Sequence, residues 1–211
     1  MRAAAAILAL AATCPATAAD LAPGPAAITA AAGEARAMVA AHEGYRVKDH
    51  VLYAVRDARG IDPADGSVDA IVVATPWERT RHAAFIAAYT ERPVSPEDAY
   101  RRAGLPAGTL AILIYAHGRD AEDRDFADRF GPARLAFDGA TVPASGPPDH
   151  SPLSEAVYPL AAGARERRVA TVTYRFDLAA LAGAGQRAGR LQFTDASGKA
   201  FDVPIDLARF R

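Results

Sequence analysis

The sequence predicts a mainly β fold in which two helices lie between strands. Three late segments, 170–178, 190–194 and 201–207, alternate apolar and polar residues, as strands with one buried face do. Two central segments, 70–74 and 110–116, are apolar throughout, which is typical of strands covered on both faces. Because each alternating strand must cover its apolar face, we expect a second sheet, giving an immunoglobulin-like β-sandwich. The alternative is an α+β two-layer domain with the helices packed on an antiparallel sheet.

Residues 1–19 have the composition of a secretory signal peptide. Arg2 precedes an apolar run over 3–12, and small residues occupy the −3 and −1 positions whether cleavage follows Ala18 or Ala19. A run of about ten apolar residues is too short for a transmembrane helix, which needs roughly 20. We therefore expect a periplasmic or secreted protein. The alternative is a membrane-anchored lipoprotein acylated at Cys14, although the leucine of such signals lies one place too far from this cysteine.

The first part of the mature chain predicts little regular structure. Residues 20–33 are rich in alanine, proline and glycine and are expected to form a flexible tether. A short helix is expected over 34–43, ended by Gly44, because alanine favours helix formation. Apolar residues then alternate over 51–55, which predicts a strand. We expect a single globular β-rich domain over 34–211.

The clearest local signals start two helices in the middle of the chain. Thr75 can cap a helix whose first residue is proline, and Glu78 completes a capping box, so a helix is expected to about Tyr89. Ser95 repeats this arrangement and starts a shorter helix that ends at Gly104. The central unit is therefore strand, helix, helix, strand.

Turn signals organise the last third of the chain. Asp138-Gly139 predicts a hairpin over 135–142, and the proline-rich segment 143–152 predicts a loop. Residues 195–198 end in glycine and suit a type I turn between the last two strands. Pro204 interrupts an alternating run, so the last strand is expected at a sheet edge.

Composition argues against several classes of function. The formal net charge of −1 provides no basic excess for nucleic acid. The only cysteine, Cys14, lies in the signal segment, so the mature chain would have no disulfide, thiolate metal site or cysteine nucleophile. The five histidines lack zinc-site spacing, and we predict neither a metal nor a cofactor.

Catalytic motifs are weak. The sequence has no Gly-x-Ser-x-Gly elbow, and Asp149-His150-Ser151 places three triad residue types in a proline-rich loop, whereas triads assemble from distant positions. The acidic stretch 120–125 is interleaved with arginines and lacks the glycine of a calcium loop. We therefore identify no catalytic residue, and the sequence leaves enzymatic activity open while favouring its absence.

The best candidates for binding lie near strand ends. Thr75, Trp77 and Glu78 begin a helix directly after one buried strand, and His117 ends the next. A pocket at this junction would contain Trp77, Glu78 and His117 as binding residues. The structural interpretations are that Trp77 packs the helix onto the sheet and that His117 bonds to a turn. Convergence of His117, Glu78, His82 and Asp120 in one cleft would favour catalysis or ligand binding.

These observations predict an exported, non-enzymatic binding or structural domain of the bacterial periplasm or envelope. Its partner would be a protein or a small molecule of unknown identity. The alternative is a small-ligand-binding protein or a hydrolase with a pocket near Thr75, Trp77, Glu78 and His117.

Overall fold

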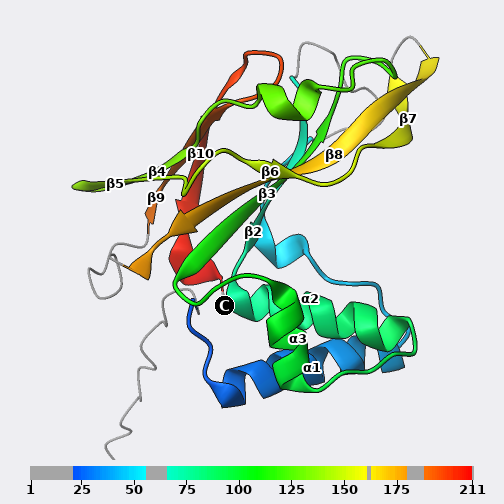
Figure 1. Cartoon of the computed structure of the whole chain (residues 1–211), viewed down its shortest axis with the longest axis vertical. Helices are drawn as coiled ribbons and strands as arrows, with labels where there is room; N and C mark the ends of the chain where they lie inside the picture. Colours follow the sequence, from blue (N-terminus) through cyan, green and yellow to red (C-terminus); the bar gives the residue numbers. More distant parts are fainter. Residues whose placement is uncertain (1–20, 56–65, 161–162, 180–187, 211) are drawn as a thin grey trace, which may run out of the picture.

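The computed structural model describes residues 21–55, 66–160, 163–179 and 188–210. Within these ranges the chain forms two antiparallel sheets and three α-helices (Figure 1). Sheet A has the order β1-β2-β3-β8-β6, with β7 also paired to β8; its strands are β1 (Val51–Ala54), β2 (Val68–Ala74), β3 (Thr109–His117), β6 (Asp149–His150), β7 (Ser154–Leu160) and β8 (Gly163–Asp177). Sheet B has the order β10-β9-β4-β5; its strands are β4 (Arg134–Phe137), β5 (Ala140–Pro143), β9 (Ala188–Thr194) and β10 (Ala200–Asp206). The prediction of a mainly β fold is confirmed.

One apolar core draws on both sheets. Sheet A contributes the buried side chains of alternate residues on its central strands, among them Ile71, Val73, Ile112, Ile114, Val172 and Tyr174. Sheet B contributes Leu135, Leu191, Phe193, Phe201, Val203 and Ile205 to the same cluster. The rings of Phe193 and Phe201 stack with their centroids 4.9 Å apart. The alternating late strands therefore bury their apolar faces in the core shared by the two sheets.

The three helices pack on one another at one end of sheet A (Figure 1). They are α1 (Pro25–Ala40), α2 (Pro76–Tyr89) and α3 (Pro96–Ala103). Their contact forms a second, smaller core of Ala32, Ala35, Met38, Ala84, Phe85 and Ala99. The oxygen of Thr75 accepts from the Glu78 amide at 3.1 Å, and that of Ser95 accepts from the Asp98 amide at 3.0 Å. These caps confirm the two predicted helices.

The N-terminal segment differs from its prediction. The first helix begins at Pro25 instead of Glu34, so much of the expected tether over 20–33 is helical. Pro25 fits the first turn because its missing N–H has no partner there in any helix. Ala31, Ala32 and Ala35 are fully buried, and their small side chains allow α1 to approach its neighbours closely. The alanines of this segment therefore indicate close helix packing and not only a flexible linker. The predicted signal peptide at 1–19, including Cys14, lies outside the described residues.

The β7–β8 hairpin was missed in the sequence. A strand was predicted from residue 170, but β8 begins at Gly163 and pairs antiparallel with β7 along its first half. Residues 163–166 are exposed, so this arm of the sheet has no apolar face to produce an alternating pattern. The segment expected to be a loop over 143–152 contains the last residue of β5, Pro143, and the two-residue strand β6.

The turns of sheet B agree with their predictions. Strands β4 and β5 form a hairpin at Gly139, whose φ is +73°, and β9 and β10 are joined by a turn in which Gly198 has a φ of +88°. Both glycines adopt the left-handed conformation that other residues rarely take. Pro204 lies on β10 at the end of the strand order, as an edge position requires.

Candidate functional site

The residues of the predicted pocket do not come together. Strands β2 and β3 are antiparallel, with Val68 opposite Ala116 and Ala74 opposite Ala111. His117 therefore lies beside the start of β2, whereas Thr75 follows its end, a separation of roughly 25 Å along the strand. The expected single pocket of Thr75, Trp77, Glu78 and His117 is not formed. The apolar runs predicted strands β2 and β3 correctly, but they do not indicate whether the two strands are parallel or antiparallel.

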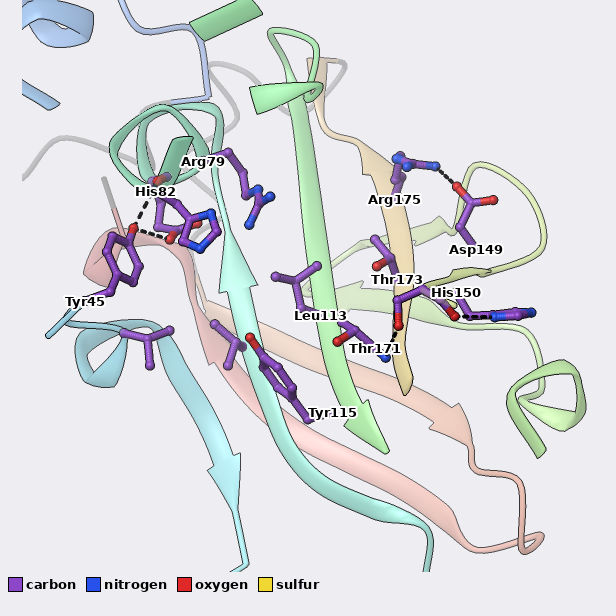
Figure 2. A pocket seen from close by; sticks show the side chains of 14 residues that line it. Tyr45, Arg79, His82, Leu113, Tyr115, Asp149, His150, Thr171, Thr173 and Arg175 are labelled. Atoms are coloured by element: carbon purple, nitrogen blue, oxygen red, sulfur yellow. Dashed lines mark hydrogen bonds and ion pairs between the residues drawn. The ribbon is translucent and has the colours of Figure 1, made fainter. Parts of the chain in front are cut away.

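A different site lies on the outer face of sheet A, the face turned away from sheet B. It is a groove of about 500 Å³ that we call the outer groove (Figure 2). Its floor is formed by outward side chains of β2, β3 and β8, namely Val72, Leu113, Tyr115, Thr171 and Thr173. Its walls come from the chain before β1 (Tyr45, Val47), from α2 (Glu78, Arg79, His82) and from the opposite side of the groove (Asp149, His150, Ser151, Arg175).

The register of the sheet orders the floor by polarity. Val72 pairs with Leu113, Leu113 with Thr173, and Thr173 with Asp149, so these four residues form one row across the sheet. The row runs from two aliphatic side chains near α2 to a hydroxyl and a carboxylate near β6. One part of the groove can therefore bind an apolar group while the other offers hydrogen-bonding groups.

Glu78 is the one residue of the predicted pocket that lines the outer groove. Its side chain is 3% exposed, and Oε1 accepts a hydrogen bond of 2.5 Å from the Tyr45 hydroxyl. Oε2 is buried and has no hydrogen-bond partner among the described atoms. Burial raises the pKa of Glu78 above its ordinary value, outweighing the opposing effects of Tyr45, Arg79 and Arg81. Burial therefore favours the neutral acid at this position.

Thr75 and Trp77 have structural roles in the described contacts. Thr75 is fully buried and caps α2. Trp77 is 4% exposed, and the Arg81 guanidinium lies 5.0 Å from its ring centroid and 5.3 Å from that of Tyr45. Arg81 also donates to the Arg46 carbonyl oxygen at 3.1 Å. This stack joins α2 to the segment before β1 and so fixes the wall of the outer groove.

His82 and Arg79 extend the same wall. The His82 ring meets that of Tyr45 edge-on at 4.9 Å. Burial, and secondarily the Arg79 charge, lower the pKa of His82 to about 4, so it is neutral at pH 7. The Arg79 side chain extends over the sheet (Figure 2) and makes no hydrogen bond or ion pair with any residue that the structure describes. It is half-buried.

His117 belongs to a separate polar network. Its Nδ1 lies 2.8 Å from Asp69 Oδ1, and the Tyr158 hydroxyl donates to the other oxygen of Asp69. The rings of His117 and Tyr158 are 4.8 Å apart, and Arg167 lies over the Tyr158 ring. Asp69 and Tyr158 line a smaller cavity of about 270 Å³ that adjoins the outer groove at Tyr115, Ser151 and Thr171. The network attaches β7 to strands β2 and β3.

The four residues whose convergence would favour catalysis, Glu78, His82, His117 and Asp120, do not lie in one cleft. Glu78 and His82 share the wall of the outer groove. His117 is buried in the Asp69 network, and Asp120 accepts from the Glu122 amide at 3.1 Å within its own loop. In the described residues, no group of three histidine, cysteine or acidic side chains is placed to hold a metal ion.

Sequence reasoning missed most of the outer groove. Thr171 and Thr173 are polar positions of the alternating strand β8 and indicated a face outside the apolar core. The pattern did not predict which other residues line that face. Arg79 was visible only as a residue in the first turn of a helix. No family model, curated protein or solved structure matches the chain. None of the described helices has the length and apolar character to cross a membrane.

Proposed function

We propose that this chain is an exported, non-enzymatic binding domain and that its ligand binds in the outer groove. The observation that carries the proposal is the composition of the groove, in which aliphatic side chains lie beside an arginine that makes no hydrogen bond or ion pair with the described side chains. Ligand sites typically combine an apolar lining with a few polar groups that fix orientation. The volume of about 500 Å³ suits a small molecule.

Contacts at the β6 side of the groove favour binding over hydrolysis. Asp149 pairs with Arg175, and His150 Nε2 lies 3.4 Å from Asp128. Ser151 accepts from the Thr171 amide at 3.0 Å and donates to the Pro152 carbonyl oxygen at 3.3 Å. His150 Nδ1 lies 2.8 Å from the Ser151 carbonyl oxygen, so among the described contacts neither imidazole nitrogen reaches the Ser151 hydroxyl, which instead holds the chain against β8. A serine nucleophile requires its histidine within hydrogen-bond reach.

The proposal includes an immunoglobulin-like β-sandwich as scaffold. The shared core of two antiparallel sheets supports a sandwich, since side chains of both sheets pack in one cluster. The helices do not provide the main cover of the apolar strand faces, because they have a core of their own. This arrangement favours the sandwich over the two-layer alternative.

Export to the periplasm or medium rests on the signal-like residues 1–19. The test is the intact mass of the protein recovered from a bacterial host that expresses the full chain. Cleavage after Ala18 or Ala19 gives a soluble product without Cys14. A diacylated Cys14 at the N-terminus would replace this proposal by a membrane-anchored form, and an uncleaved chain in the cytoplasm would contradict export.

The binding site is tested by filling the groove. A panel of small metabolites is screened for compounds that raise the melting temperature of the mature chain, as ligands of a folded state do. We expect Thr173→Trp to abolish the effect of each hit, because the indole would occupy the floor. Thr141→Trp, at an exposed position of β5 in sheet B, is the matched control. Hits that stabilise Thr173→Trp as well as wild type would contradict binding in this groove.

A further inference from the structure

We propose that the ligand of the outer groove is a small carboxylic acid with an apolar body. Its carboxylate pairs with Arg79, and its body lies on Val72 and Leu113. This inference deepens the proposed function and rests on it. Three observations support it, namely the state of Arg79, the burial of the neighbouring acid and the composition of the floor.

Arg79 differs from the other arginines near the groove. Arg175 is paired with Asp149, and Arg81 is held by the Arg46 carbonyl oxygen and lies 3.7 Å from Glu34. Arg79 is half-buried over the sheet but has no such contact with the described residues. A guanidinium in a partly desolvated site is stabilised by a carboxylate, which it can bind through two parallel hydrogen bonds.

The adjacent acid, Glu78, makes no hydrogen bond or ion pair with Arg79. The Glu78 carboxyl is directed into the contact with Tyr45, where burial disfavours its charged form. His82 is neutral at pH 7 because burial lowers its pKa to about 4. Of the α2 side chains that line the groove, Arg79 is therefore the charged one that extends over the sheet, while the Glu78 carboxyl is buried against Tyr45 (Figure 2). That charge favours an anionic group on the ligand.

The floor distinguishes an organic acid from an inorganic anion. Val72 and Leu113 lie directly opposite each other on β2 and β3, and Val47 lines the same groove. Phosphate or sulfate would leave the partly exposed side chains of Leu113 and Val47 in contact with water, whereas a hydrocarbon chain would cover them at about 25 cal/mol per Å². Thr171 and Thr173 could hydrogen-bond a second polar group of the ligand. An acid with an apolar body uses both features.

The test uses sodium hexanoate, its neutral analogue hexanamide, and sodium phosphate, each titrated into the mature chain by calorimetry. We expect hexanoate to bind at millimolar concentration or below and hexanamide to bind about tenfold more weakly, the difference of one charge-assisted contact. Phosphate should bind more weakly than hexanoate. Arg79→Gln should reduce hexanoate binding to the level of hexanamide, and Arg79→Lys should retain part of it. Arg102→Gln, at an exposed position on α3, is the control.

The outcomes separate this inference from the proposed function. Equal binding of hexanoate and hexanamide, both lost in Thr173→Trp, would keep the groove as a binding site and overturn the acidic ligand. Hexanoate binding that survives Thr173→Trp would contradict both. No binding of hexanoate at millimolar concentration, or unchanged binding by both Arg79 variants, would overturn the inference. Circular dichroism and melting temperature establish that each variant is folded.

Discussion

The two faces of sheet A use the same strands for different purposes. On the inner face, Ile112, Ile114 and Val172 are fully buried in the core shared with sheet B. On the outer face, their neighbours Leu113 and Thr173 line the outer groove. Tyr115, on the same face, is 43% exposed. Residues on the inner face therefore stabilise the fold, whereas residues on the outer face can bind a ligand with little effect on stability.

The difference arises from what covers each face. Sheet B packs against the inner face of the central strands of sheet A, whereas the helices gather at one end of sheet A (Figure 1). The wall of α2 covers part of the outer face and leaves the groove beside it.

The first prediction compares consecutive residues on β3. Ile112→Ala should lower the free energy of unfolding by about 2 to 5 kcal/mol, because it removes buried methylenes and leaves a cavity. Leu113→Ala should cost about 1 kcal/mol or less, since Leu113 lies at the groove and is only partly buried. Urea denaturation of both variants measures the difference. Equal costs would contradict the division of the two faces.

A second pair exchanges polarity between the faces of β8. Val172→Thr should lower the free energy of unfolding by about 1 to 3 kcal/mol, because it buries a hydroxyl in the apolar core. Thr173→Val, the adjacent outward position, should change it by about 0.5 kcal/mol or less. Thermal unfolding at a fixed pH compares the two. A Thr173→Val variant as unstable as Val172→Thr would show that the outer face is also core.

The third prediction concerns pH. Burial lowers the folded-state pKa of His82 from 6.5 to about 4, so the folded protein resists protonation of this imidazole more than the unfolded chain does. The free energy of unfolding is therefore at its full value above pH 6.5 and decreases as the pH falls toward 4. His82→Phe retains a ring against Tyr45 but cannot be protonated. Between pH 7 and pH 4.5 its free energy of unfolding should therefore decrease by roughly 1 to 2 kcal/mol less than that of the wild type. The exposed His42→Asn is the control. An unchanged pH profile in His82→Phe would contradict a buried, neutral imidazole.

The smallest expected effect is at the edge of sheet A. Tyr158→Phe removes the hydroxyl that donates to Asp69 and should cost about 1 kcal/mol. Amide exchange in β7 should become faster, because this network attaches the strand to β2 and β3. Tyr89→Phe, at a residue that is 70% exposed, should leave both measurements unchanged. Faster exchange throughout sheet A would mean that the network supports the whole sheet.

Local signals predicted the elements that depend on nearby residues. Thr75 and Ser95 indicated the starts of α2 and α3, because capping involves an amide three residues away. The alternation in β8 identified the inner face, since that pattern follows from burial on one side. These features supplied most of the fold.

The candidate site depended on relations that no local pattern contains. His117 was assigned to the Glu78 pocket because strand direction was unknown, and the antiparallel register places it at the other end of β2. The outer groove joins residues from the chain before β1 to β8, and these contacts exist only after folding. The first part of α1, residues 25–33, was assigned to the tether because its buried alanines resemble a linker until a neighbouring helix is known.

The central claim is that a ligand binds to the outer face of sheet A and not to its core. It is tested most directly by methyl NMR spectra of the mature chain titrated with sodium hexanoate. We predict progressive shifts in the methyl signals of Val72, Leu113 and Thr173, with little change at Ile112 and Val172 on the inner face. Shifts confined to residues outside the groove, or equal shifts on both faces, would contradict the account.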